Sequence, residues 1–244
     1  VDRCNDRDAQ GLEGADGVLA CLGENFGAER RKGCDLRDVG AGDEGFLACS
    51  GQDQHPTQAL LDIYTLKRSF ERRGGLRDKT VMFVGDLARG RTVRSLSDLL
   101  LNYNNIRLVF IAPEPMQISE DVCNSLSSHG VDWIASSDMH KYQTEVDATY
   151  MTRIQDEWDF VKKKKKKIDT SRFKIGLDEM RICKPDAILM HPLPRRDEIA
   201  KEVDHDPRAM YWRQMRNGMW IRAALIASTF DCAERVNEFY RENI

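Results

Sequence analysis

The sequence predicts an α/β fold built on a doubly wound parallel sheet that is flanked by helices. From residue 54 onward, short apolar runs typical of buried strands alternate with helix-length amphipathic stretches. Such alternation is typical of strand–helix–strand units, whose strands lie parallel in one sheet. With 244 residues, of which 41% are hydrophobic, the chain can bury a substantial core.

The expected elements follow one another closely. A first helix begins at Pro56, because proline is favoured in the first turn of a helix, and it ends at Gly74 and Gly75. Buried strands are expected at residues 80–85, 106–112, 131–135, 148–151 and 187–190. Further helices are expected at residues 91–103, 119–128 and 220–240. The last is apolar through most of its first half, which predicts that more than one of its sides is covered.

The composition changes abruptly near residue 54. Residues 1–53 hold ten of the 17 glycines and four of the seven cysteines, with few aliphatic runs. A segment of this composition is not typical of a folded domain. The segment is interpreted either as a divergent stretch, for example from a shifted reading frame, or as a Gly-rich flexible extension.

Charge and cysteine spacing exclude several classes of protein. The net charge of -3 provides no global attraction for nucleic acid, and no run is long and apolar enough to predict a membrane helix. Residues 162–167 are six lysines, interpreted as a solvated loop, with nucleic-acid binding as the alternative. No two of the seven cysteines have the C-x-x-C spacing, which argues against a zinc or redox pair and favours a reducing cytoplasm.

Two polar segments coincide with expected helix starts. His55-Pro56-Thr57-Gln58 opens the first helix, where unpaired N–H groups favour an anionic or carbonyl ligand and where a histidine can donate to a substrate oxygen. Helix capping is the alternative role for His55. The segment from Gly85 to Thr92 joins a strand to a helix as a nucleotide-binding P-loop does, but Arg91 stands where that motif has lysine.

Arginine at this position favours a different ligand. The planar guanidinium of Arg91 suits a carboxylate, although nucleotide binding remains a rival interpretation. Arg153 and Gln155 follow the strand at 148–151 and, two residues apart, point to one side. A second arginine beside Arg91 would suit a substrate with two carboxylates, whereas a surface salt bridge is the alternative.

The segment His191-Pro192-Leu193-Pro194-Arg195 follows the last expected strand. Its two prolines lack N–H groups, so neighbouring carbonyl oxygens are left without local donors. Those oxygens can accept hydrogen bonds from an amine. A stiff structural turn is the alternative interpretation.

Together and in this order, the four segments resemble aspartate carbamoyltransferase. The matching stretches are His-Pro-Thr-Gln-Ala-Leu-Leu-Asp from His55, Val-Gly-Asp-x-x-x-Gly-Arg-Thr-Val-x-Ser-Leu from Val84, Tyr-Met-Thr-Arg-x-Gln from Tyr150 and His-Pro-Leu-Pro-Arg from His191. The related ornithine enzymes typically carry His-Cys-Leu-Pro in the last segment. The aspartate branch therefore fits this chain better.

The resemblance implies transfer of a carbamoyl group from carbamoyl phosphate to L-aspartate in pyrimidine biosynthesis, without a metal or organic cofactor. It implies that His55 polarises the carbamoyl carbonyl as the catalytic residue and that Gln58 and the carbonyls of Leu193 and Pro194 bind the carbamoyl group. By the same resemblance, the aspartate carboxylates are bound by Arg91, Arg153 and Gln155. It also implies a cytoplasmic homotrimer in the full form, which can carry a regulatory chain.

The resemblance has a gap, because the family's Ser-Thr-Arg-Thr phosphate loop is absent from the sequence. The expected organisation is an aberrant remnant of the carbamoyl-phosphate domain at 1–53, a linking helix at 54–75, an aspartate-binding domain at 76–218 and a C-terminal helix at 219–244. Lacking its packing partner, that helix should expose an apolar face at residues 220–230. A non-catalytic remnant that binds aspartate or a partner protein is the alternative to an enzyme.

Overall fold

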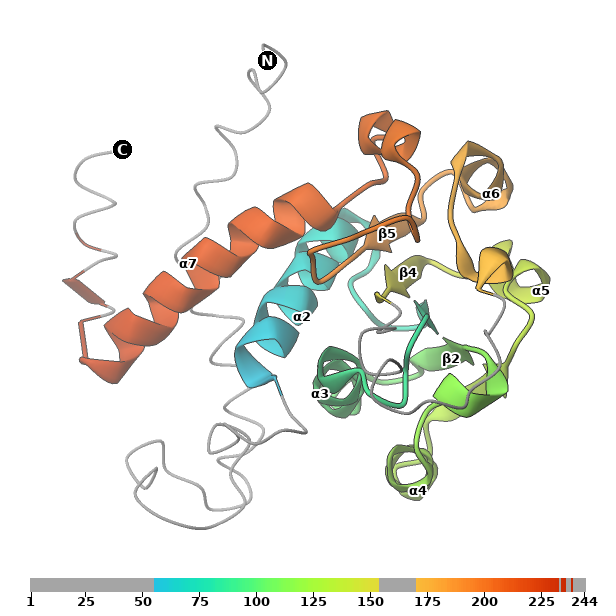
Figure 1. Ribbon diagram of the computed structural model, residues 1–244. Helices are drawn as coiled ribbons and strands as arrows, with labels where there is room; N and C mark the ends of the chain where they lie inside the picture. The colour runs from blue at the N-terminus through green and yellow to red at the C-terminus, as the bar shows by residue number, and fades with distance from the viewer. Residues whose placement is uncertain (1–54, 154–169, 233, 236–237, 239–244) are drawn as a thin grey trace, which may run out of the picture.

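A five-stranded, fully parallel sheet forms the centre of the protein (Figure 1). The computed structural model describes residues 55–153, 170–232, 234–235 and 238. The strands lie in the order β3-β2-β1-β4-β5, and all five coincide closely with the predicted runs. Their bounds are Thr80–Val84 for β1, Arg107–Ile111 for β2, Asp132–Ser136 for β3, Ala148–Met151 for β4 and Ile188–Met190 for β5. The predicted fold class is confirmed.

Helices cover both faces of the sheet (Figure 1). Successive residues of each strand point to opposite faces, so each strand contributes to two cores. The first core lies under α2 (Pro56–Phe70), α3 (Arg91–Leu100) and α4 (Glu120–Ser128). The second lies under α5 (His140–Gln143), α6 (Leu177–Ile182) and η7 (Lys201–His205). Burial on both faces explains why the strands are continuously apolar instead of alternating with polar residues.

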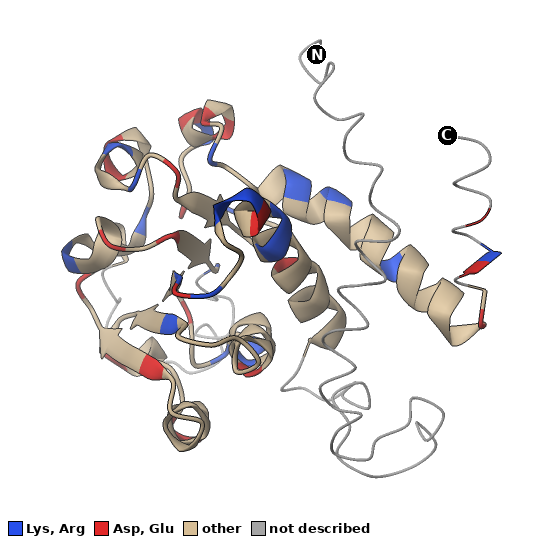
Figure 2. Ribbon diagram, turned by 180° about the vertical axis from the view of Figure 1, so that it is seen from behind, with Lys and Arg blue, Asp and Glu red and all other residues tan. Residues whose placement is uncertain are grey.

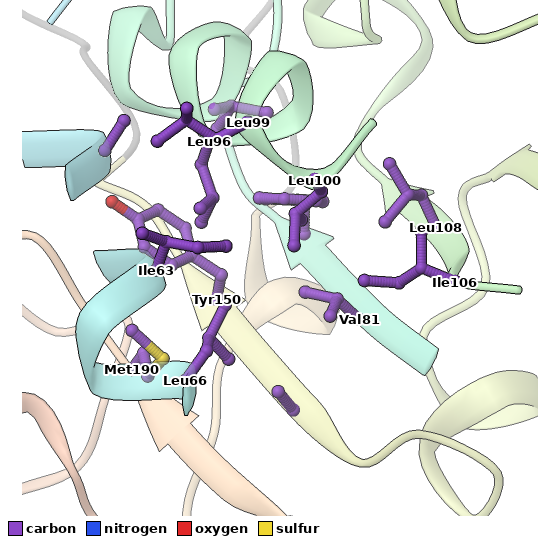
Figure 3. Close-up of a cluster of buried hydrophobic side chains, with 14 of the residues drawn as sticks. Ile63, Leu66, Val81, Leu96, Leu99, Leu100, Ile106, Leu108, Tyr150 and Met190 are labelled. Carbon is purple, nitrogen blue, oxygen red and sulfur yellow. The ribbon is translucent and has the colours of Figure 1, made fainter. Parts of the chain in front are cut away.

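Aromatic rings lie at the centre of the first core. Phe83 of β1 stacks on Phe110 of β2 with ring centroids 5.3 Å apart, and Tyr150 of β4 lies 5.6 Å from Phe83 on its other side. Figure 3 shows Tyr150 in one cluster of buried side chains with Ile63 of α2 and Leu96 of α3. The described part of the predicted linking segment, residues 55–75, contains α2 and η3 (Glu71–Arg73) and packs on the sheet beside α3.

The C-terminal helix α7 spans Tyr211–Thr229, so the predicted start of this helix at residue 220 is wrong. Its buried stripe consists of Tyr211, Gln214, Gly218 and Ile221. Because two of these four are glutamine and glycine, the stripe does not register as an apolar repeat. The stripe contacts α2, which lies alongside α7 in Figure 1.

The end of α7 also differs from the prediction. The N–H of Cys232 donates to the Ala227 carbonyl and that of Asp231 donates to Ser228, with Asp231 in the left-handed region at φ 54°. These two bonds form a Schellman motif, which stops the helix. Such an end usually carries glycine, so a sequence with aspartate there gives no stop signal. The predicted end at residue 240 lies outside the described residues.

The predicted exposed apolar face at residues 220–230 is confirmed for this part of the chain. Trp220, Ile226 and Phe230 are 45%, 60% and 73% exposed. Residues 223–229, the last part of α7, include no Lys, Arg, Asp or Glu, and the end of this helix is tan in Figure 2. The expectation that more than one side of this helix is covered is therefore wrong within the described ranges. None of the helices in those ranges has the length and apolar character needed to cross a membrane.

Candidate functional site

The candidate site lies where the strand order reverses. From β1 the chain builds outward through β2 to β3, and it then returns to the other side of β1 to add β4 and β5. Open parallel sheets bind ligands at such a switch point, outside the carboxyl ends of the strands. The predicted Gly85–Thr92 segment follows β1, and Arg153 follows β4. The switch point thus brings together two segments that are some 60 residues apart in the sequence.

Gly85 allows these two segments to touch. It adopts φ 125°, and a Cβ at this position would lie 2.5 Å from the carbonyl oxygen of Thr152 and also overlap its Oγ1. Thr152 in turn donates to the Val84 carbonyl through its N–H (2.8 Å) and its Oγ1 (3.1 Å). Only glycine satisfies both the backbone angle and the close approach.

The loop after Gly85 is not a phosphate cradle. A P-loop directs backbone N–H groups at the phosphates. Here the Leu87 and Ala88 N–H groups donate to the Met116 carbonyl at 2.9 and 3.0 Å, and the Arg89 N–H donates to the buried Asp86 carboxylate at 3.3 Å. Asp86 also accepts the Arg89 Nε–H at 2.7 Å, so an ion pair occupies the loop. The nucleotide-binding interpretation is therefore wrong.

His55 and Arg91 lie close to each other at the starts of α2 and α3. The His55 N–H donates to Ser95 Oγ at 2.9 Å, which ties the two helix starts together. Burial lowers the pKa of the half-buried His55 imidazole, and the positive charges of Arg91 and Arg222 lower it further. A neutral imidazole at neutral pH follows. Arg91 is exposed, and its side chain makes no ion pair with any carboxylate in the described ranges.

Gln58 belongs to a buried polar cluster one turn further along α2. Its Nε2 donates to Asp62 Oδ1 at 2.9 Å, and the same oxygen accepts Gln214 Nε2 of α7 at 2.6 Å. The Tyr150 hydroxyl donates to Asp62 Oδ2 at 2.6 Å. The cluster therefore joins α2, β4 and α7 beneath the carboxyl end of the sheet.

The loop after β5 is held by its own histidine. The Leu193 N–H donates to His191 Nδ1 at 2.8 Å, so this ring nitrogen carries no proton, and His191 Nε2–H donates to the buried Glu198 at 2.8 Å. Leu193 adopts φ 49° before a cis bond to Pro194. Among the described residues, none donates a hydrogen bond to the Leu193 or Pro194 carbonyl oxygen.

The predicted site residues thus gather at one edge of the sheet, with one exception. Gln155 lies outside the described residues, whereas Arg153 is half-buried at the end of β4. Sequence reasoning missed Asp62, Gln214, Glu198 and Arg222. Asp62 carried a weak signal, since it follows Gln58 by one helical turn. Within the described ranges, no group of three His, Cys, Asp or Glu side chains is arranged to hold a metal ion.

Comparison with known proteins gives consistent matches. The family model described as "Aspartate/ornithine carbamoyltransferase, Asp/Orn binding domain" matches residues 77–229. Aspartate carbamoyltransferase 1, chloroplastic, of Pisum sativum is 38% identical over 217 residues, which cover 88% of this chain and 54% of that protein. The aspartate carbamoyltransferase catalytic subunit of Vibrio cholerae is 39% identical over 184 residues, which cover 74% of this chain and 57% of that protein.

Solved structures agree with these sequence matches. Aspartate transcarbamoylase of Trypanosoma cruzi, in complex with N-(phosphonacetyl)-L-aspartic acid, superposes with a TM-score of 0.62 at 36% identity, covering 72% of this chain and 54% of that one. The catalytic subunit of M. jannaschii aspartate transcarbamoylase superposes with a TM-score of 0.63 at 32% identity, covering 73% of this chain and 56% of that one. The chain spans about half the length of the relatives it matches.

Proposed function

Because the chain belongs to the aspartate/ornithine carbamoyltransferase family, we propose that it serves in carbamoyl transfer from carbamoyl phosphate to L-aspartate. The products are N-carbamoyl-L-aspartate and phosphate. This reaction is an early step of pyrimidine biosynthesis. The observation that carries this proposal is the presence of Arg91 and Arg153 at the β1–β4 switch point. Two guanidinium groups there suit a substrate with two carboxylates.

The aspartate branch is favoured over the ornithine branch. The Pisum sativum and Vibrio relatives are named aspartate carbamoyltransferases, and Trypanosoma cruzi structures contain aspartate with phosphate or carbamoyl phosphate. In the proposed complex, Arg91, Arg153 and Gln155 bind the two carboxylates of L-aspartate. Ornithine has only one α-carboxylate and a cationic side chain, which two arginines would repel.

The reaction makes few chemical demands on side chains. The amino nitrogen of L-aspartate attacks the carbonyl carbon, a C–N bond forms, the C–O bond to phosphate breaks and the nitrogen loses one proton. Positioning two anions and stabilising oxyanion charge therefore provide most of the rate. Neutral His55 donates an N–H to the carbamoyl oxygen, and the lowered pKa of His55 keeps it in that form at neutral pH.

The carbamoyl nitrogen needs acceptors, since each of its N–H groups is a donor. We assign this role to the carbonyl oxygens of Leu193 and Pro194, which accept no hydrogen bond from the other described residues. Gln58 lies beside His55 at the start of α2 and would contact the same group. No metal or organic cofactor is required for this chemistry.

The proposal extends to assembly and compartment. By its family, the full form is expected to be a homotrimer, able to carry a regulatory chain, in the cytoplasm. The plant relatives are named chloroplastic, so a plastid location is the competing outcome. Light scattering of the purified chain tests the trimer, and fractionation of the source cells tests the compartment.

The decisive assay measures carbamoyl-aspartate formation by the purified chain with L-aspartate and with L-ornithine. Arg153→Ala should abolish turnover, whereas Arg181→Ala should not, because the exposed Arg181 side chain pairs with the exposed Asp178 on the surface of α6. Calorimetry with L-aspartate accompanies each assay. If the wild-type chain shows neither turnover nor L-aspartate binding, the proposal is wrong.

A binding-only role is the second candidate. The chain spans about half the length of its relatives, and the family's Ser-Thr-Arg-Thr phosphate loop is absent from its sequence. L-aspartate binding that depends on Arg153, without turnover, would favour this candidate over the enzyme.

A further inference from the structure

Three donors converge on one fully buried carboxyl group. Asp62 has no exposed surface, and it accepts the amide groups of Gln58 and Gln214 on Oδ1 and faces the Tyr150 hydroxyl with Oδ2. Both amide nitrogens can only donate, so Oδ1 must be an acceptor in each contact. None of the described Lys, Arg or His side chains forms an ion pair with Asp62. The group is therefore held by neutral donors alone.

The second contact of Gln214 leads to the loop after β5. Gln214 Oε1 accepts the backbone N–H of His191 at 2.8 Å, while its Nε2 donates to Asp62. Both polar ends of this buried side chain are thus engaged. The chain of hydrogen bonds continues from His191, whose Nδ1 accepts the Leu193 N–H and whose Nε2–H donates to Glu198. Glu198 also accepts the Arg196 N–H at 3.0 Å, which closes the loop on itself.

We propose that Asp62 is a positioning residue that holds Gln58 directly and the His191–Leu193 backbone through Gln214. This inference rests on the proposed function, because Gln58 and the Leu193 carbonyl would bind the carbamoyl group. Asp62 itself touches no substrate. Its role is to keep α2 and the loop after β5, which are far apart in sequence, in one mutual geometry.

The hydrogen-bond geometry distinguishes this role from simple core packing. A buried carboxyl without a charged partner is costly, and apolar residues would fill the same space more favourably. Asparagine can replace Asp62 without losing a contact: its oxygen accepts both glutamine amides, and its NH₂ donates to the Tyr150 oxygen. Leucine has similar volume but provides no acceptor. The two substitutions therefore separate hydrogen bonding from volume.

The test uses amide hydrogen exchange of the full chain, measured by NMR at His191 and Leu193. In Gln214→Leu and Asp62→Leu, exchange at both amides should rise about tenfold or more, as local opening becomes easier. Asp62→Asn should stay near the wild-type rates. Gln143→Leu is the matched control, because Gln143 is an equally buried glutamine that bonds to Glu179 on the other face of the sheet.

Two results would overturn the inference: unchanged exchange at His191 and Leu193 in Gln214→Leu, or opening in Asp62→Asn equal to that in Asp62→Leu. If Asp62→Leu does not fold, Gln214→Leu and Asp62→Asn still decide the question. Calorimetry of the wild-type chain with L-aspartate runs in parallel. Absence of L-aspartate binding together with absence of turnover would contradict the proposed function, while the exchange rates would still decide the role of Asp62.

Discussion

The Tyr150 hydroxyl donates a 2.6 Å hydrogen bond to Asp62, although the two residues lie 88 positions apart. Tyr150 is fixed in β4 by its register with Phe83 and Met190, and Asp62 lies two turns into α2. Burial, and then the neighbouring Asp62 carboxylate, raise the pKa of Tyr150 well above its ordinary value, so the phenol remains a donor. This bond fixes α2, and with it His55 and Gln58, against the carboxyl end of the sheet.

Removing the charge of Asp62 should change how stability depends on pH. Burial raises the pKa of Asp62 from 3.8 to about 7, so the unfolded chain ionises this group well before the folded protein does. The folded state is therefore favoured below pH 4, and this contribution is lost as the pH rises towards 7. Between pH 5 and 7, the unfolding free energy of Asp62→Asn should rise relative to that of the wild type by about 1.4 kcal/mol per pH unit. Above pH 7 the difference should level off. Urea unfolding at four pH values measures this difference, and a pH-independent difference would contradict it.

Substitution of Gly85 should be severe. Alanine there combines a backbone angle of φ 125° with overlap on Thr152, which predicts a loss of about 3 kcal/mol or more in unfolding free energy. Gly130→Ala is the matched control, because Gly130 also has a positive φ of 67° but no atom within 4 Å of the added Cβ. Its cost should be about 1 kcal/mol. Equal losses in urea unfolding would show that the contact with Thr152 is unimportant.

Two isoleucines of α7 should differ sharply. Ile221 is fully buried against the first core, whereas Ile226, on the same helix, is 60% exposed. Ile221→Ala should lower the unfolding free energy by about 2–4 kcal/mol. Ile226→Ala should change it by less than about 0.5 kcal/mol. A large loss from Ile226→Ala in thermal or urea unfolding would mean that this face of α7 is covered.

Neutralising Arg91 should raise the pKa of His55. The charge of Arg91 disfavours the protonated imidazole, so Arg91→Gln should move the pKa of His55 upward, towards its ordinary value. The shift should remain incomplete, because burial is the larger cause and Arg222 is unchanged. NMR titration of the His55 ring protons measures it. Arg181→Gln provides the control. An unchanged pKa of His55 in Arg91→Gln would show that the charge of Arg91 does not act on His55.

Sequence reasoning located the strands because burial on both faces makes each a short, continuous apolar run between polar boundaries. It also found Arg91, Arg153 and the His191 segment, since polar residues directly after buried strands must gather at the carboxyl edge of a parallel sheet. These conclusions need only local patterns and the rules of parallel sheets.

The sequence alone therefore determined the five parallel strands, the helices α2, α3 and α4, and the edge that carries the candidate site. Only the tertiary structure revealed the bond between Gln214 and Asp62, which spans 152 positions, and the true start of α7 at Tyr211. A buried polar pair leaves no periodic apolar signal, and each partner is recognisable only beside the other. Packing of α2 against α7 brings the two together, and that packing is decided by the whole fold.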